Sequence, residues 1–193
     1  MPLPTRARIL KASSQLYLNG GDRALSMRRV ADRIGVSATA IYRHFPDRAE
    51  LVEAVVDDAF AEFQRFLSKV PPGRGSRTEL RRFMRQYLEF VIEKPRLFEV
   101  IFLRRRASMR RYPEDFSARK SETFEQLHDI VKACVASGAL RGDVDSMEMA
   151  LTIWLHGHGF ASQYWVGRFG SDTHRVRTMF EKSVNLLIEG IAP

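Results

Sequence analysis

One stretch near the start of the sequence, VSATAIYRHFPDR at 36–48, gathers residue types that bind nucleic acid. It holds hydroxyl and small residues, followed by a tyrosine, a histidine and two arginines. Hydroxyl and cationic side chains donate hydrogen bonds to phosphate oxygens, and arginine also pairs with the edge of guanine. A short amphipathic helix with a crowded polar face and no DNA role is the alternative interpretation. The elements around the stretch decide between the two.

Two helices are expected before this stretch. The first spans about 5–18 and ends at NGG, 19–21, because glycine adopts the left-handed cap conformation at little cost. Ser26 is placed to cap a second helix over 27–34, and Gly35 ends that helix. Both helices carry apolar residues three and four positions apart, which is the period of an amphipathic helix.

The stretch itself predicts a short third helix over 38–44, capped by Ser37, and Asp47 is placed to cap a long fourth helix over 48–70. Short helices joined through a glycine-containing turn are typical of a helix-turn-helix, whose last helix presents its N-terminal residues to the major groove. Small residues at the start of that helix let the backbone approach base edges, and helix N-termini favour phosphates. The predicted DNA contacts are Ser26, Arg28, Ser37, Ala38, Thr39, Tyr42, Arg43, His44 and Arg48.

Residues 6–51 resemble the DNA-binding domain of TetR-family transcriptional repressors. The pattern is carried by Ile9, Ala12, Leu16, Gly20, Ser26, Val30, Ala31, Gly35, Val36, Ser37, Ile41, Tyr42, His44, Phe45 and Leu51. Two departures are mild, because Ser26 stands where threonine is commoner and Arg48 where lysine is commoner. Phe45 is expected to be a core anchor. The resemblance implies a homodimer that binds a palindromic double-stranded DNA operator and releases it when a small molecule binds.

Charge and composition fit a cytoplasmic protein that binds DNA. The net charge is +8, and residues 1–50 carry nine Arg or Lys against four Asp or Glu. This bias favours a polyanionic partner, because neutralised phosphates release counterions. A single cysteine, Cys134, excludes an internal disulfide and fits a reducing compartment. No apolar run approaches the roughly 18 residues of a membrane-spanning helix, so we expect no membrane partner.

The rest of the chain predicts a larger helical bundle, so the fold is expected to be all-α. PPGRGS at 71–76 is the clearest break, because neither Pro-Pro nor Gly-x-Gly continues a helix. We therefore expect an N-terminal three-helix helix-turn-helix DNA-binding domain over 1–48 and a helical ligand-binding and dimerisation domain over 49–193. Beyond the break, helices are expected over 77–93, 95–106, 114–137, 144–168 and 172–190.

Aromatic residues gather in this second region, where twelve of the 13 phenylalanines lie beyond residue 50. An ordinary core is the simpler interpretation of any one of them. Together they predict a mostly apolar pocket with few polar groups, and the family resemblance implies such a pocket for a small, largely apolar effector. WLHGHG at 154–159 also resembles a Trp-x-His-Gly signature of one class of TetR C-terminal domains. The predicted ligand residues are Phe63, Tyr87, Phe98, Phe102, Phe124, His128, Trp154 and His158.

The last two long helices carry apolar stripes, and Gly157, Gly159 and Ala161 permit close helix approach. A homodimer through a four-helix interface would bury both stripes, and a two-fold dimer is the commonest closed assembly. The alternative is that both stripes face the protein's own core. The predicted interface residues are Leu151, Leu155, Ser162, Trp165, Val176, Phe180, Val184 and Leu187.

RRRASMRR at 104–111 is expected to be solvated surface, with an anionic effector or a further phosphate contact as alternatives. Enzymatic chemistry is not expected: no two histidines share a helical face at metal-ligand spacing, and Cys134 lies in an apolar helix. We predict no catalytic site, metal or cofactor. The competing hypothesis is a helical small-molecule-binding protein or enzyme whose helix-turn-helix shape has no operator. Whether a regulator would activate or repress also stays open.

Overall fold

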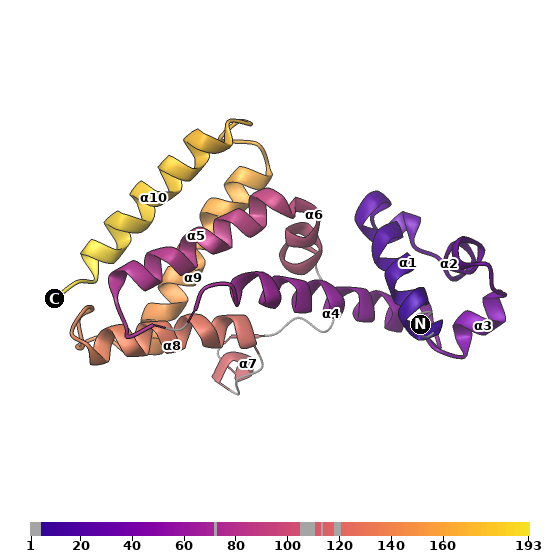
Figure 1. The fold of residues 1–193 in the computed structure, drawn as a ribbon, viewed down its shortest axis with the longest axis horizontal. Coiled ribbons are helices and arrows are strands. Elements are labelled where there is room, and N and C mark those ends of the chain that lie inside the picture. Colours follow the sequence, from indigo (N-terminus) through magenta and orange to yellow (C-terminus); the bar gives the residue numbers. More distant parts are fainter. Residues whose placement is uncertain (1–4, 72, 105–110, 113, 118–120) are drawn as a thin grey trace. The chain divides into compact units, whose positions relative to one another are not determined.

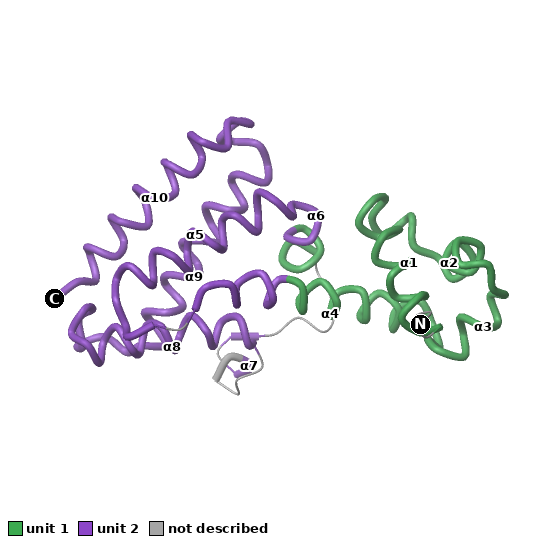
Figure 2. The backbone as a smooth tube through the Cα atoms, in the orientation of Figure 1, with its two compact units in different colours: residues 1–62, 99–104 green, residues 63–98, 105–193 purple. Residues whose placement is uncertain are grey.

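The computed structural model describes residues 5–71, 73–104, 111–112, 114–117 and 121–193. Every element in these residues is helical and none is a strand, so the prediction of an all-α fold is confirmed for them. The chain forms two compact units: unit 1 holds Met1–Glu62 with Glu99–Arg104, and unit 2 holds Phe63–Phe98 with Arg105–Pro193 (Figure 2). This division by packing differs from a boundary after residue 48, because most of the fourth helix packs with the N-terminal helices.

Unit 1 is built from helices (Figure 1) and has a small apolar core. Ile9, Val30, Ile41 and Phe45 are completely buried in it. The third helix ends two residues earlier than predicted, so His44 lies in the following turn. Its elements are α1 (Thr5–Gly20), η1 (Asp22–Ala24), α2 (Met27–Ile34), α3 (Ala38–Tyr42) and the larger part of α4 (Arg48–Leu67).

Side chains cap these helices where the sequence predicted. The Ser26 hydroxyl accepts a hydrogen bond from the Arg29 amide, and the Ser37 hydroxyl accepts one from the Ala40 amide, both at 3.2 Å. Gly35 ends α2 in the left-handed conformation, with φ of 70°. These bonds satisfy amides that a helix start otherwise leaves unpaired. The caps matter because a five-residue helix has little stability of its own.

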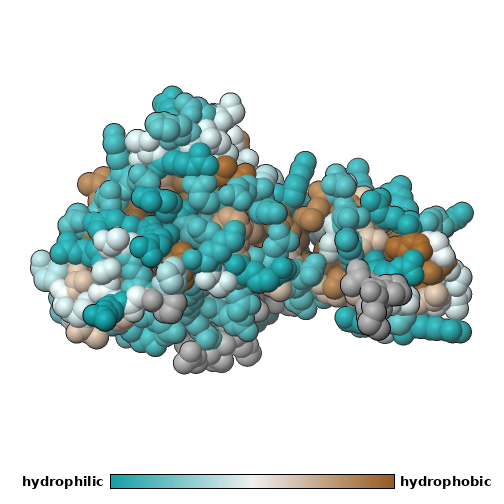
Figure 3. Space-filling view, viewed as in Figure 1, coloured by the Kyte–Doolittle hydropathy of each residue, from teal (hydrophilic) through white to brown (hydrophobic). Residues whose placement is uncertain are grey.

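Unit 2 contains the longer helices, with α5 packed against α8, α9 and α10. Its visible face is mostly hydrophilic, with small hydrophobic areas between the polar side chains (Figure 3). Two predicted helices are broken: 95–106 becomes α6 followed by a π-helical turn, η2 (Glu99–Leu103), and 114–137 becomes α7 and α8. The helices of unit 2 are α5 (Arg77–Glu93), α6 (Pro95–Phe98), α7 (Glu114–Ser117), α8 (Glu122–Ala136), α9 (Ser146–Trp165) and α10 (Thr173–Gly190).

The glycine-rich break before α5 is a close contact between two backbones. A Cβ on Gly75 would lie 2.1 Å from the Ala133 carbonyl oxygen, so only glycine fits there, and its φ of +75° also favours glycine. The Ser137 hydroxyl donates to the Gly75 carbonyl at 2.6 Å. The buried Glu79 carboxylate accepts from the Gly73 and Gly75 amides at 2.6 and 3.1 Å. This break therefore joins the start of α5 to the end of α8.

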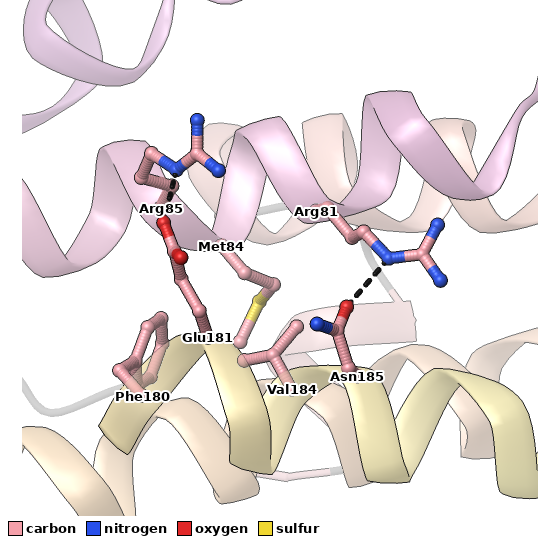
Figure 4. A pocket seen from close by; sticks show the side chains of 7 residues that line it. All are labelled: Arg81, Met84, Arg85, Phe180, Glu181, Val184 and Asn185. Atoms are coloured by element: carbon pink, nitrogen blue, oxygen red, sulfur yellow. Dashed lines mark hydrogen bonds and ion pairs between the residues drawn. The ribbon is translucent and has the colours of Figure 1, made fainter. Parts of the chain in front are cut away.

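α5 and α10 lie antiparallel, and polar side chains pair across them at four-residue intervals. Met84, Phe180 and Val184 close the space below two of these pairs, leaving a cavity of about 60 Å³ (Figure 4). The pairs are Arg77 with Glu189, Arg81 with Asn185 and Glu189, Arg85 with Glu181, and Arg177 with Glu89. We call these five pairings the α5–α10 ladder.

Candidate nucleic-acid interface and effector site

The exposed face of α3 carries the residues predicted to touch DNA. Tyr42 is 51% exposed, and Thr39 and Arg43 are exposed as well, whereas Ile41 and Phe45 between and beside them are completely buried. The apolar residues thus fix α3 on unit 1 and leave its polar side free for a partner. Ser37, Ala38 and Arg28 are exposed too, whereas Ser26 and His44 are partly buried.

Arg48 is held inside unit 1. Its guanidinium donates to the Asp22 and Leu25 carbonyls at 2.6 and 3.0 Å and forms an ion pair with the Asp22 carboxylate at 2.8 Å. The side chain still exposes 41% of its surface. Arg48 therefore braces the loop before α2 against the start of α4, a role that its sequence position did not indicate because Asp22 lies 26 residues earlier.

A second brace that the sequence analysis missed lies on α1. The guanidinium of Arg6 lies 4.8 Å from the centre of the Phe45 ring, and Arg8 donates to the Ile34 carbonyl at 2.8 Å. A cation over an aromatic face is attracted by the ring's quadrupole. Two arginines that add positive charge to unit 1 thus also hold α1 against the helix-turn-helix.

Six of the eight predicted ligand residues form one group in unit 2, which we call the ring cluster. Trp154 is at its centre: the centroids of the Tyr87, Phe124 and Phe63 rings lie 5.5, 6.1 and 6.3 Å from its own, and that of His158 lies at 4.6 Å. The members are Phe63, Tyr87, Phe98, Phe124, Trp154 and His158. These rings pack directly against one another in the interior of unit 2.

The polar groups of the ring cluster are paired with each other. The Tyr87 hydroxyl is hydrogen-bonded to Nδ1 of His158, and the two rings come from α5 and α9. Burial raises the pKa of Tyr87 well above its usual value, and desolvation lowers the pKa of His158 to about 4. Both groups are therefore neutral at pH 7, so the cluster offers neutral hydrogen-bonding groups and no charge.

The structure shows one further contact for each of the remaining two predicted ligand residues. Phe102 belongs to unit 1, where its ring packs edge-on against Phe60 at 6.0 Å. His128 is hydrogen-bonded to the Ser146 hydroxyl at 3.0 Å, at the start of α9. A role in ligand binding stays a prediction for both residues.

A separate cleft of about 500 Å³ opens between the end of α4, the start of α5 and α8. Carboxylates of Glu79, Glu122 and Asp129 face it, together with the apolar Val70 and Ile130. Asp129 is paired with Lys132 at 2.6 Å. The cleft differs in chemistry from the ring cluster, and the sequence analysis did not single it out.

The structure corrects part of the predicted subunit interface. Val176, Phe180 and Val184 are at most 3% exposed because their stripe of α10 faces the interior of unit 2. Side chains buried in their own chain are not available to a partner. Two other predicted interface residues are exposed, Leu155 at 58% and Trp165 at 37%, and so is Leu186, which was not predicted, at 76%.

Other predictions fall at the edge of the described residues. Arg104 is described and is not solvated surface, because its guanidinium is paired with Glu99 at 2.7 Å; residues 105–110 of the basic run lie outside the described residues.

No group of three or more metal-ligating side chains occurs in the described part of the chain. No described helix is both long and apolar enough to cross a bilayer.

Two family models match the chain. Residues 9–55 match bacterial regulatory proteins of the tetR family, and residues 80–187 match the tetracyclin repressor-like C-terminal domain. The HTH-type transcriptional repressor KstR of Rhodococcus jostii is 35% identical over 98 residues, which cover 50% of this chain and 45% of that repressor. This chain therefore spans less than half the length of that relative.

Solved structures share the fold. A protein of unknown function from Rhodococcus sp. RHA1 superposes with a TM-score of 0.82 at 20% identity, over 100% of this chain and 97% of that one. FadR of Bacillus subtilis, solved in complex with stearoyl-CoA, gives a TM-score of 0.74 at 14% identity, over 96% of this chain and 98% of that one. Because one family model covers more than half of the chain and the other covers the helix-turn-helix, the chain belongs to the TetR family of bacterial regulatory proteins, which are DNA-binding transcriptional regulators and not enzymes.

Proposed function

We propose that this protein is a ligand-responsive transcriptional repressor that binds a palindromic operator as a homodimer. The face of α3 would enter the major groove, with Thr39 and Arg43 at base edges and Tyr42 at a phosphate. An effector in the ring cluster would favour a second conformation that binds the operator less well. It can do so only through its different affinities for the two conformations.

The observation that carries this proposal is the contrast between the two sides of α3. Its exposed side holds only small, hydroxyl, aromatic and cationic residues, while Ile41 on the other side is fully buried. The Ser37 cap also places the first amides of the helix next to its exposed polar residues. Helix N-termini of this kind attract phosphate oxygens.

The homodimer is proposed on the exposed apolar residues of the last two helices. Leu155 on α9 is 58% exposed, Leu186 on α10 is 76% exposed, and Val166 directly after α9 is 57% exposed. A single exposed leucine is ordinary, but two helices that both expose one favour a four-helix interface. A dimer places two recognition helices about 34–36 Å apart, or slightly more, on one side of the duplex.

The repressor assignment draws on KstR, whose name describes a repressor. The site of action would be the cytoplasm, where the DNA lies. A helical ligand-binding protein without an operator is the competing function. It predicts weak DNA binding that is indifferent to sequence.

Selection from a random DNA pool near 150 mM salt is the decisive test. We expect enrichment of a palindrome, because a two-fold dimer presents two identical recognition helices. Tyr42→Ala should weaken binding to the enriched sequence and to unrelated DNA alike, whereas Thr39→Val should change which bases are preferred. Arg82→Ala, at an exposed position of α5 in unit 2, is the control for loss of one positive charge. Failure to enrich any sequence contradicts the proposal.

The dimer and the effector have separate tests. Leu186→Glu should shift the mass in sedimentation from dimer to monomer, because it places a charge at the centre of the proposed interface.

For the effector, Trp165→Phe leaves Trp154 as the single tryptophan, inside the ring cluster. Its fluorescence should change when an apolar ligand enters, and stearoyl-CoA is a first probe since FadR binds it. Unchanged fluorescence across a panel of apolar ligands would place the effector site elsewhere.

A further inference from the structure

The segment after α6 leaves unit 2 and packs with the N-terminal helices. α6 ends at Phe98, and the next five residues form the π-helical turn η2, in which Val100 and Ile101 are buried. Residues 99–104 belong to unit 1, although the residues before and after them belong to unit 2. π-helical turns are rare and occur frequently at functional sites. The position of this turn therefore calls for a functional explanation.

Arg104, at the end of this turn, closes a contact with α1. Its guanidinium donates to the Glu99 carboxylate at 2.7 Å and lies 5.1 Å from the centre of the Tyr17 ring. A second guanidinium nitrogen is 3.5 Å from the Tyr17 hydroxyl. Tyr17 is 4% exposed and the Glu99 side chain 15%. Partial burial of these groups strengthens a cation–π contact relative to one on an open surface.

Gly21 leaves the space that the guanidinium occupies. A Cβ at this position would lie 3.0 Å from Nη2 of Arg104, and the φ of +65° is one that other residues rarely adopt. The Gly21 amide also donates to the Tyr17 carbonyl at 2.8 Å, which ends α1. We call the group formed by Tyr17, Gly21, Glu99 and Arg104 the Arg104 clasp.

The other end of the segment lies in the ring cluster. Phe98 is completely buried, and its ring packs edge-on against His158 at 6.2 Å. The five residues of η2 thus separate Phe98 from Arg104, and the first of them, Glu99, is itself part of the Arg104 clasp. Because the turn carries two buried side chains, a displacement of Phe98 is not freely absorbed within it.

We propose that Arg104 is a positioning residue that fastens η2 to α1, so that displacement of Phe98 in the ring cluster is transmitted to the helix-turn-helix through residues 99–104. The proposal rests on the proposed function, since it needs a DNA-binding unit 1 and a ring cluster that an effector opens. It assigns Arg104 a role apart from any charge attraction to DNA. Without the clasp, η2 would still move with Phe98, but Arg104 would no longer pass that movement on to α1.

A double-mutant cycle tests this proposal without an effector. Phe98→Ala stands in for the displacement of Phe98 that an effector would cause, and Arg104→Ala removes the clasp. The DNA probe is the operator enriched from the random pool. We expect Phe98→Ala to change the operator dissociation constant about fivefold or more when Arg104 is present, the lower end of typical couplings between sites. In the Arg104→Ala background the same change should be less than about twofold. Arg82→Ala is the charge control and should leave the full effect of Phe98→Ala.

Equal effects of Phe98→Ala in both backgrounds would overturn the proposal, and so would no effect in either. Unfolding curves of each variant identify loss of folded protein, which acts on all DNA affinities equally. Arg104→Lys keeps the charge but not the planar stack on Tyr17, so it should restore only part of the coupling.

Amide hydrogen exchange tests the clasp independently of DNA. Arg104→Ala should speed exchange at residues 17–20 and 99–103 by about fivefold, the factor expected for loss of one cation–π contact of this kind. Unchanged protection there would overturn the proposal. If the wild-type protein enriches no DNA sequence while Arg104→Ala still loosens both segments, the proposed function fails and the clasp stands.

Discussion

The two candidate sites of this protein are held in opposite ways. In unit 1, α3 has five residues and depends on a serine cap and on Ile41 and Phe45 beneath it, while Tyr42 projects into solvent. In unit 2 the ring cluster is itself part of the core, and Phe63 in it is completely buried. On α3 the exposed side chains proposed to contact DNA are thus separate from the buried ones that hold the helix, whereas in unit 2 the proposed ligand residues are themselves core residues. Substitutions in the two units should differ accordingly.

The largest expected effect contrasts Phe63→Ala with Tyr42→Ala. Truncating a buried phenylalanine removes its burial and leaves a cavity, so Phe63→Ala should lower the free energy of unfolding by about 3–5 kcal/mol. Tyr42→Ala, at a 51% exposed position, should change it by about 0.5 kcal/mol or less while weakening DNA binding. Urea unfolding of the three proteins measures both values. A cost for Tyr42→Ala close to that of Phe63→Ala would remove the distinction between the units.

The next effect is a loss of stability in acid that originates in unit 2. The pKa of His158 is lowered to about 4 in the folded protein, from an ordinary value of 6.5. Between these values the unfolded chain binds a proton that the folded protein does not, so stability falls as the pH falls from 6.5 to 4, by up to about 3 kcal/mol. Unfolding of wild type and His158→Gln at pH 7, 5.5 and 4.5 measures it. The variant should lack this part of the pH dependence; parallel curves would contradict the assignment.

A smaller effect is expected at two serine N-caps whose hydrogen bonds have the same length. The Ser37 hydroxyl caps the five-residue α3, and the Ser76 hydroxyl caps the 17-residue α5, both at 3.2 Å. Loss of either cap should cost about 1 kcal/mol of unfolding free energy. Only Ser37→Ala should also speed hydrogen exchange within α3 and weaken operator binding, because α5 is held along its whole length by its neighbours. Equal effects of both variants on operator binding would show that α3 does not depend on its cap.

Local signals explain why unit 1 was predictable from the sequence. Gly35, Ser26 and Ser37 each act on residues within four positions, and the structure confirms all three caps. The brace between Arg48 and Asp22 was not predictable, since no local pattern links residues 26 positions apart. The sequence thus predicts where helices begin and end better than what their long side chains meet.

In unit 2 the sequence showed the helical spacing of the apolar stripes, but not the surface that each stripe packs against. The stripe of Val176, Phe180 and Val184 has helical spacing whether it faces a second subunit or the chain's own α5. The structure places it inside. Similarly, nothing in the residues 99–103 marks a π-helical turn, because its cause is packing of the segment with unit 1. Tertiary contacts override local preference at these positions.

The smallest expected effect concerns the α5–α10 ladder. Arg177 contacts both oxygens of Glu89, at 2.7 and 2.8 Å, with 40% and 21% of the side chains exposed. Arg85 and Glu181 form a single contact at 2.9 Å and are 59% and 46% exposed. Double-mutant cycles should give about 0.5–1 kcal/mol for the first pair and less than about 0.5 kcal/mol for the second, because exposed ion pairs are screened by water. Both values should fall in 1 M salt.

These small energies set what the ladder can do. The apolar stripe below it supplies most of the attraction between α10 and α5, since burying one large aliphatic or aromatic side chain contributes about 1.5–3 kcal/mol. The ladder instead disfavours a shift of α10 by one turn, because a shift in one direction would place Arg85 opposite Arg177 and a shift in the other would place Glu89 opposite Glu181. The register of α10 against α5 matters because it also decides where Leu186 lies in the proposed dimer interface. A coupling above about 2 kcal/mol for either pair would mean that charges hold α10 in place, and part of the stability of unit 2 would then come from residues outside its core.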